Sequence, residues 1–225
     1  MNQYRYETHL HTTQASACAR VSAAEHVNFY KKAGYSGIVV TDHFFNGNSC
    51  IPKELPWEQR IDLFCKGYED AKKEGDRIGL SVFFGLEVNF RGTEFLIYGV
   101  DKAWLKNHPD MLSWTVDEQY RHVHAAGGFI IHAHPFRVRP YIKEARLFPE
   151  AVDAVEAINV GNGSDEFDRQ AMDYAKQHHF PVTAGTDAHG KESLHSGIAF
   201  QHKIKDMQDL IDSIRSGEGE LILPQ

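Results

Sequence analysis

Two kinds of hydrophobic pattern alternate along the chain. Short apolar runs rich in β-branched and aromatic residues predict strands covered on both faces. These runs lie at residues 37–41, 80–86, 95–100, 129–131, 155–160, 181–186 and 197–200, after a first strand near residues 6–12. Between them, apolar residues recur at helical spacing. This spacing predicts helices at residues 22–32, 57–74, 116–126, 165–178 and 207–216.

The alternation of strands and helices indicates parallel βαβ units, right-handed and covered on both faces. About seven such units fit a closed barrel of the TIM type. The alternative is an open doubly wound sheet, but no Gly-x-Gly-x-x-Gly turn follows the first strand. We therefore expect a single α/β domain over residues 1–225, with its active site at the C-terminal rim of the strands.

Composition narrows the class of protein. The net charge is −7, with 31 acidic and 24 basic residues and no basic run, which disfavours nucleic acid as the main partner. The 3 cysteines are odd in number and form no Cys-x-x-Cys pair, so we expect a reducing compartment. No apolar run is long enough to cross a membrane, and residues 1–5 lack the apolar core of a signal peptide. These features predict a cytoplasmic protein without a membrane partner.

Metal-binding residue types gather where the predicted strands end. In the first strand, alternation places Glu7, His9 and His11 on one face. Imidazole and carboxylate groups bind divalent metals, and the strand ends of a parallel barrel converge on one rim. The sequence therefore predicts a metal centre there. The later strands end in further residues of this kind: Asp42, His43, Glu87, His134, Asp187 and His189.

The motifs around these residues resemble those of the PHP (polymerase and histidinol phosphatase) family, in the family's order and over nearly the whole chain. They are His9-Leu-His11, Thr41-Asp-His43, Gly85-Leu-Glu87, Ala133-His134-Pro135 and Gly185-Thr-Asp187-Ala-His189. The resemblance implies a distorted seven-stranded (β/α) barrel, hydrolysis of phosphate esters, and up to three ions of Zn, Mn or Fe. Carried over position by position, the implied metal ligands are His9, His11, His43, Glu87, His134, Asp187 and His189.

Two positions depart from the family pattern. An aspartate normally follows the His-x-His motif; counting forward from His11 reaches Ser16, and counting back from the helix cap Ser22 reaches Cys18. A thiolate at Cys18 can replace that aspartate and would favour Zn or Fe. The other interpretation of Cys18 is a small apolar residue in a tight loop. On a later strand Leu96 occupies the place of a family histidine and cannot bind a metal, so we expect one or two ions rather than three.

Roles in hydrolysis follow from the residue types. Divalent ions neutralise phosphate charge and lower the pKa of bound water, and Glu87 has two oxygens with which to bridge two ions. Asp187 or His189 would orient the attacking water or protonate the leaving oxygen. Guanidinium groups bind phosphate through paired hydrogen bonds. Three arginines are candidates for this role, with solvent-facing or ion-paired positions as the alternative: Arg137, Arg139 and Arg20.

Three further side chains are predicted to support the ligands from behind. Asp42 would accept the second ring N–H of His43. Glu7 is either a partner of this kind or a buried strand carboxylate paired for structural reasons. His132 lies on the strand face of His134 and is a ligand, a proton donor or a satisfied core histidine.

The leading functional hypothesis is a metal-dependent phosphoesterase that acts on a small phosphorylated metabolite or nucleotide. Two alternatives stay open. One is hydrolysis of an amide or another non-phosphate bond at the same centre. The other is a non-catalytic, regulatory metal-binding module.

Overall fold

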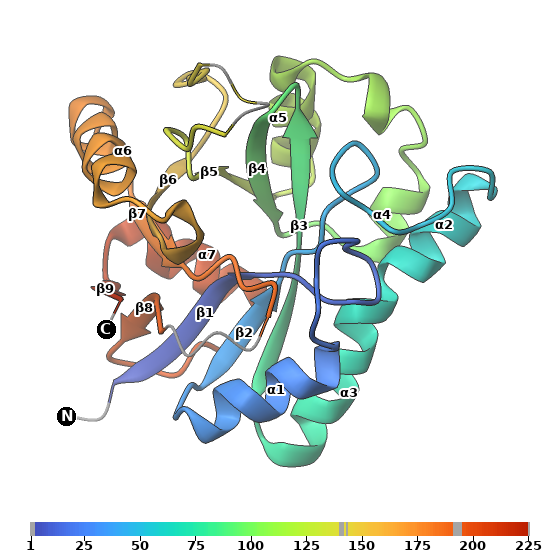
Figure 1. Cartoon of the computed structure of the whole chain (residues 1–225), viewed down its shortest axis with the longest axis horizontal. Coiled ribbons are helices and arrows are strands. Elements are labelled where there is room, and N and C mark those ends of the chain that lie inside the picture. Colours follow the sequence, from blue (N-terminus) through green and yellow to red (C-terminus); the bar gives the residue numbers. More distant parts are fainter. Residues whose placement is uncertain (1–2, 140–141, 143, 191–194, 225) are drawn as a thin grey trace.

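The computed structural model describes residues 3–139, 142, 144–190 and 195–224. These residues form a sheet of nine strands in the order β7-β6-β5-β4-β3-β2-β1-β8-β9 (Figure 1). The strands are β1 (Tyr4–Leu10), β2 (Gly37–Val40), β3 (Ser81–Phe90), β4 (Thr93–Tyr98), β5 (Phe129–Ala133), β6 (Ala154–Asn159), β7 (Val182–Gly185), β8 (Gly197–Phe200) and β9 (Glu220–Ile222).

The helices follow the predicted pattern closely. They are α1 (Ala23–Lys32), α2 (Trp57–Phe64), α3 (Lys66–Ile78), α4 (Lys102–Lys106), α5 (Val116–Ala125), α6 (Asp165–His178) and α7 (Met207–Ser216), with short 3₁₀ turns at Met111–Ser113 and Val160–Asn162. Two differences stand out. The helix predicted at residues 57–74 is two helices that meet at Cys65, and α4 and β9 were not predicted.

Strands β1 to β7 curve into a nearly closed barrel, as predicted. Thr8 donates its hydroxyl to the Ala184 carbonyl at 2.7 Å, and the His11 N–H donates to the Ala188 carbonyl at 3.0 Å. These bonds bring β1 against the end of β7, at the two ends of the seven-stranded arc. Strands β8 and β9 continue the sheet beyond β1 in antiparallel pairing.

The expectation of parallel βαβ units throughout is wrong at β8, which pairs antiparallel with β1, and at β4. This strand pairs antiparallel with both β3 and β5. A two-residue turn joins β3 to β4, and both of its residues, Arg91 (φ 54°) and Gly92 (φ 94°), have the positive φ of a type I′ hairpin. Because β4 runs the other way, its first residues, and not its last, lie at the rim where the parallel strands end.

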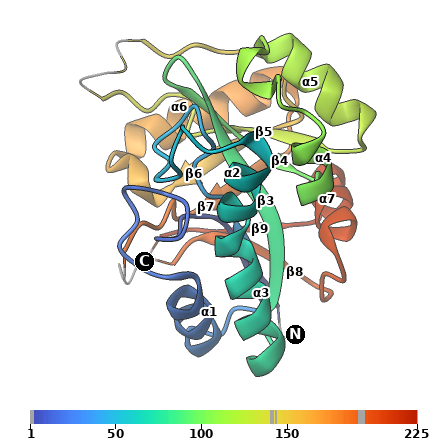
Figure 2. The same ribbon diagram turned by 90° about the vertical axis from the view of Figure 1, so that its right-hand side faces the viewer.

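Helices cover the outside of the barrel. α1 and α3 lie side by side below the strands in Figure 1, and their side chains, including Val27, Tyr30 and Ala71, pack against β2 and β3. α7 packs Ile211 and Ile214 against another part of the sheet, and Figure 2 shows it at the right-hand side of the molecule. No helix in the described part of the chain is both long and apolar enough to traverse a lipid bilayer.

Candidate metal centre

The predicted ligands meet at the C-terminal end of the barrel. His9 Nε2 lies 3.3 Å from Glu87 Oε1 and 3.4 Å from Asp187 Oδ1. His11 Nε2 lies 2.9 Å from the same Asp187 oxygen. His134 Nε2 is 3.2 Å from Glu87 Oε1. Residues from β1, β3, β5 and the segment after β7 therefore present their donor atoms to one buried space.

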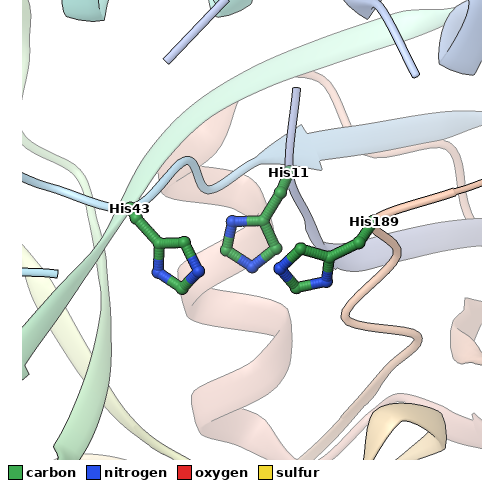
Figure 3. A group of neighbouring side chains, drawn as sticks. All are labelled: His11, His43 and His189. Carbon is green, nitrogen blue, oxygen red and sulfur yellow. The ribbon is translucent and has the colours of Figure 1, made fainter. Parts of the chain in front are cut away.

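The donors form overlapping groups whose atoms lie within 4.8 Å of one another. One group consists of three imidazoles, with the ring of His11 stacked between those of His43 and His189 (Figure 3). The centroid of the His11 ring lies 4.2 Å from that of His43 and 4.3 Å from that of His189. The remaining groups are His9, Glu87 and His134; His9, His11 and Asp187; and His43, Glu87 and Glu94.

Unsatisfied polar atoms show that this donor set fits a cation. His43 Nδ1 and Glu87 Oε2 are 2.6 Å apart and buried, yet neither makes a hydrogen bond of acceptable geometry with any residue that the structure describes. Buried polar atoms without partners are rare because their desolvation is not offset. A divalent ion would satisfy both atoms, and imidazole with carboxylate is a donor set that such ions accept. The cluster fits divalent metal binding.

Glu156 orients His9 and was missed by sequence reasoning. Its Oε1 accepts the ring N–H at Nδ1 of His9 at 2.9 Å, and its Oε2 accepts the backbone N–H of His134 at 3.0 Å. With the proton held at Nδ1, the Nε2 lone pair of His9 is left for the centre. The available signal was a charged residue inside the buried strand β6, where Glu156 has 0% exposure.

Asp42 lies elsewhere than predicted. Adjacent strand residues point to opposite faces, so its carboxylate does not follow the ring of His43. It accepts instead from the Thr12 backbone N–H at 2.6 Å and from the Ser16 hydroxyl at 2.7 Å. Ser16 Oγ lies 3.3 Å from His11 Nδ1 and accepts the His43 backbone N–H at 3.0 Å. Asp42 thus supports the ligands through Ser16.

The charges of the centre stabilise one another. Burial opposes ionisation of Glu87 and Asp187, but nearby imidazoles, and Arg137 beside Asp187, hold the pKa of both carboxyls well below the usual range. Burial likewise disfavours a charged His43, yet Glu87 raises the pKa of that imidazole well above its ordinary value. Burial and the charge of His43 lower the pKa of His11.

Cys18 belongs to the same cluster. Its side chain is partly buried and hydrogen-bonded to the imidazoles of His189 and His43. Burial opposes the thiolate, but these hydrogen bonds outweigh it and lower the pKa of Cys18 to about 6. Of the two positions considered for the missing aspartate, Ser16 supports His11, whereas Cys18 faces the imidazoles.

The three candidate arginines differ in position. Arg137 Nη1 is 2.7 Å from Asp187 Oδ2, and its Nε and Nη2 donate one hydrogen bond each, to Asn162 and Asn159. Arg139 donates to the Gly161 carbonyl at 2.7 Å and contacts no ligand among the described hydrogen bonds. Arg20 is exposed, and its backbone N–H donates to the His189 carbonyl at 2.7 Å. Arg137 is the arginine held directly at the centre.

Glu7 is a buried strand carboxylate paired for structural reasons, which is one of the two roles that the sequence left open for it. Its Oε1 accepts the backbone N–H groups of His9 at 2.8 Å and Thr186 at 3.0 Å, and its Oε2 accepts the Tyr30 hydroxyl at 2.9 Å. It therefore fastens β1 to β7 and α1. Burial, its largest influence, raises the pKa of Glu7 to about 7 despite these hydrogen bonds.

His132 does not join the cluster. His134 follows the last residue of β5 and has a positive φ of 27°, which breaks the strand alternation that would place both rings on one face. The His132 ring instead stacks on Phe95 at 5.2 Å, and neither ring nitrogen has a hydrogen-bond partner among the described residues. It is a core histidine, but not a satisfied one.

Glu94 is the second residue that sequence reasoning missed. Leu96 is buried in the core, as its side chain requires, but Glu94, two residues earlier on β4, lies 3.5 Å from His134 Nε2. The ligands predicted from the sequence lie at the C-terminal ends of strands, whereas β4 is antiparallel and has its N-terminal end at the rim. The Thr-Glu pair before an apolar run was the only signal.

Two backbone features position the ligands. Asp187 (φ 54°) and His134 (φ 27°) both have left-handed conformations, which are strained for residues other than glycine and are concentrated at functional sites. Gly185 allows β7 to approach β1, because a Cβ there would lie 2.7 Å from His9 Cβ and 2.8 Å from Glu156 Oε1. The close contact is needed to bring Asp187 to the histidines.

Comparison with known proteins agrees with this picture. A PHP-associated family model matches residues 166–218, which include Asp187 and His189. A comparison with curated proteins finds no match.

Solved structures share the fold at low sequence identity. A two-domain protein of Bacteroides vulgatus that contains a predicted PHP-like metal-dependent phosphoesterase matches 99% of the chain with 12% identity and a TM-score of 0.76; the chain spans 65% of that protein. A candidate metal-dependent phosphoesterase of Bifidobacterium adolescentis matches 93% of the chain and 95% of its own length, with 15% identity and a TM-score of 0.60.

An amidohydrolase of Chromobacterium violaceum, with bound sulfate and no metal, matches 84% of the chain and 88% of its own length, with 12% identity and a TM-score of 0.58. The matched C-terminal segment and the order of the motifs resemble those of the PHP domain family, and the chain shares its barrel fold with these PHP-like structures.

Proposed function

We propose that this protein is a metal-dependent phosphoesterase that hydrolyses a small phosphorylated metabolite or nucleotide. The proposal includes one PHP-type domain over residues 1–225, a cytoplasmic location and no membrane partner. It also includes one or two ions of Zn, Mn or Fe, because the donors combine nitrogen and oxygen.

The observation that carries the proposal is the position of Arg137 beside the donor cluster. Its Nη1 is fixed 2.7 Å from Asp187, whose other carboxylate oxygen is 2.9 Å from His11. A guanidinium next to a cation site suits a substrate with several anionic oxygens better than a neutral amide. Divalent ions supply Lewis acidity, which neutralises phosphate charge and activates water.

Side chains of the protein would bind the substrate phosphate and transfer protons. Arg137 uses three N–H groups on Asp187, Asn159 and Asn162, which leaves two of its five donors for a phosphate oxygen. Asp187 and His189 are the proposed groups that orient water or give a proton to the leaving oxygen. Arg139 and Arg20 remain candidates for contacts farther along the substrate.

The competing activity is amide hydrolysis, because one similar fold belongs to an amidohydrolase. The test is a panel of phosphate monoesters, phosphate diesters and amides, assayed with protein reloaded with Mn or Zn. We expect phosphate ester hydrolysis that falls more than about 100-fold in Asp187→Asn and His9→Ala, since even partners of metal ligands contribute about 10–100-fold.

His122→Ala is the matched control, because this histidine is exposed on α5, and it should retain full activity. Turnover of amides alone would replace the proposal with the amidohydrolase function. A protein that binds metal but hydrolyses nothing in the panel would support a regulatory module. Equal activity in wild type and both site variants would refute the ligand assignment.

A further inference from the structure

The guanidinium of Arg137 is oriented by two amides from another part of the chain. Its Nε donates to Asn162 Oδ1 at 3.0 Å, and its Nη2 donates to Asn159 Oδ1 at 2.6 Å. Asn159 is the last residue of β6, and Asn162 is the last residue of the 3₁₀ turn that follows it. The segment that leads from β6 to α6 therefore supplies both amide oxygens.

A carboxylate lies behind each of these amides. Asp168 Oδ1 accepts the side-chain N–H of Asn162 at 2.6 Å and the backbone N–H of Asn159 at 3.2 Å. Glu156 Oε2 accepts the side-chain N–H of Asn159 at 2.8 Å. An amide whose NH₂ donates to a carboxylate presents its oxygen on the opposite side. Each carboxylate thus turns one amide oxygen toward Arg137.

Asp168 differs from the other acidic residues at the start of α6. Asp165 and Glu166 are exposed, and negative charge in a first helical turn favours the helix dipole. The side chain of Asp168 is instead partly buried and bonded to Asn159 and Asn162. Stabilisation of the helix would not require these bonds, because the two exposed residues already supply it.

The turn that carries Asn162 lies directly against the guanidinium. A Cβ on Gly161 would lie 3.1 Å from both Arg137 Nη2 and Asp187 Oδ2, and 3.0 Å from Asn159 Oδ1. A side chain at this position would therefore displace the Arg137–Asp187 pair. The side chain of Arg137 is only 10% exposed. Packing and hydrogen bonds together hold the guanidinium in one orientation.

We propose that Asp168 is a positioning residue for phosphate binding, which acts through Asn162 and Asn159 to hold Arg137 ready for a phosphate oxygen. A side chain that is already fixed loses less conformational freedom when it binds. The inference deepens the proposed function and rests on it for the role of Arg137. The described hydrogen bonds of Asp168 reach no candidate metal ligand, so its removal should weaken phosphate binding without loss of metal.

The test is the binding of inorganic phosphate to zinc-loaded, full-length protein, measured by calorimetry with the metal content of each sample verified. We expect Asp168→Ala to weaken phosphate binding about tenfold at unchanged metal content, the effect of a lost hydrogen bond to a charged group. Asp165→Ala is the matched control, because it removes the same charge from the same helix start. This control should bind phosphate as wild type does.

Further variants distinguish positioning from a general loss of structure. Asn162→Ala removes the intermediate link, so it should weaken phosphate binding to a similar extent and add little to Asp168→Ala. Asp168→Asn keeps an acceptor oxygen and should restore most of the affinity. In protein that carries Arg137→Ala, Asp168→Ala should have no further effect, because the group that it positions is absent.

Three results would overturn the inference. The first is phosphate binding by Asp168→Ala as tight as that of Asp165→Ala. The second is an effect of Asp168→Ala that persists undiminished when Arg137 is alanine. The third is a loss of metal in Asp168→Ala in proportion to the loss of phosphate binding, which would place the effect at the metal centre.

The outcomes separate this inference from the proposed function. Phosphate ester hydrolysis by a protein whose phosphate affinity does not depend on Asp168 would overturn the inference and leave the function intact. Phosphate binding that depends on Asp168 in a protein that hydrolyses no phosphate ester would do the reverse. A zinc-loaded wild type that neither binds phosphate nor hydrolyses its esters would overturn both.

Discussion

Glu156 shows how single residues behind the ligands set the geometry of the centre. One of its oxygens holds the His9 ring and the other holds the backbone of His134, and Asn159 donates to it at 2.8 Å. The His9 ring nitrogen that faces the centre is defined by the proton held on the opposite side of the ring. At the residue scale, His9 and the acceptor behind it therefore act as a pair.

Substitution of Glu156 by Gln should weaken metal binding about 10–100-fold, because the neutral amide holds the His9 N–H and the His134 N–H less strongly. The measurement is a competition titration with a chelator that binds the same metal. Glu150→Gln, an exposed change nearby in sequence, is the matched control. Unchanged affinity in the Glu156 variant would mean that the contact with His9 does not position the ligand.

At the scale of elements, helix α1 connects its own stability to the site. Its N-terminus has a capping box, in which Ser22 accepts the Glu25 backbone N–H and the Glu25 carboxylate accepts the Ser22 N–H at 3.1 Å. Tyr30, near the other end of α1, donates to Glu7, and Glu7 in turn fastens the backbone of His9. Helix α1 is thus connected through Glu7 to β1, the strand that carries His9.

Loss of the cap should be measurable by urea unfolding. We expect Ser22→Ala to lower the free energy of unfolding by about 1 kcal/mol, because alanine offers no oxygen to the orphan N–H of the first turn. Ser22→Gly should lower the free energy of unfolding by only about a few tenths of a kcal/mol, since glycine leaves the N–H groups of the first turn open to water. Equal losses in the two variants would show that the hydroxyl does not act as a cap.

At the scale of the whole molecule, the barrel encloses a titratable group that its core does not satisfy. The ring of His132 is fully buried beside Phe95, with Tyr174 near it at 6.2 Å. Burial, with a smaller effect of His134, lowers the pKa of His132 from 6.5 to about 3. The folded protein therefore holds this ring neutral where the unfolded chain would protonate it.

The sign of the resulting pH dependence follows from the two pKa values. Between about pH 6.5 and about pH 3, His132 is protonated in the unfolded state but stays neutral in the folded state. Stability is full above this range and falls as the pH is lowered, by about 1.4 kcal/mol per pH unit. Between pH 7 and pH 5, His132→Phe should lose about 2 kcal/mol less than wild type.

The measurement is urea unfolding of both proteins in chelator-containing buffer, so that metal release contributes to neither. Phenylalanine keeps the aromatic packing against Phe95 without a titratable nitrogen. Identical pH profiles for the two proteins would show that His132 is protonated without cost in the folded state.

The sequence determined most of the local structure and much of the ligand set. Patterns in apolar runs predicted the strands and helices because burial in a covered sheet or on one helix face leaves a periodic record. The ordered motifs from His9 to His189 predicted which rim residues would meet, and the structure brings all seven together.

Only the tertiary structure decided the features that depend on chain direction and on contacts distant in sequence. The antiparallel course of β4 placed Glu94 at the rim and Leu96 in the core. The turn at His134 sent His132 away from the centre. Glu156 acquired its role because the close approach of β7 to β1 brings a buried carboxylate to a ring 147 residues away. Such contacts leave no periodic trace in a single sequence, since they are set by how the barrel closes.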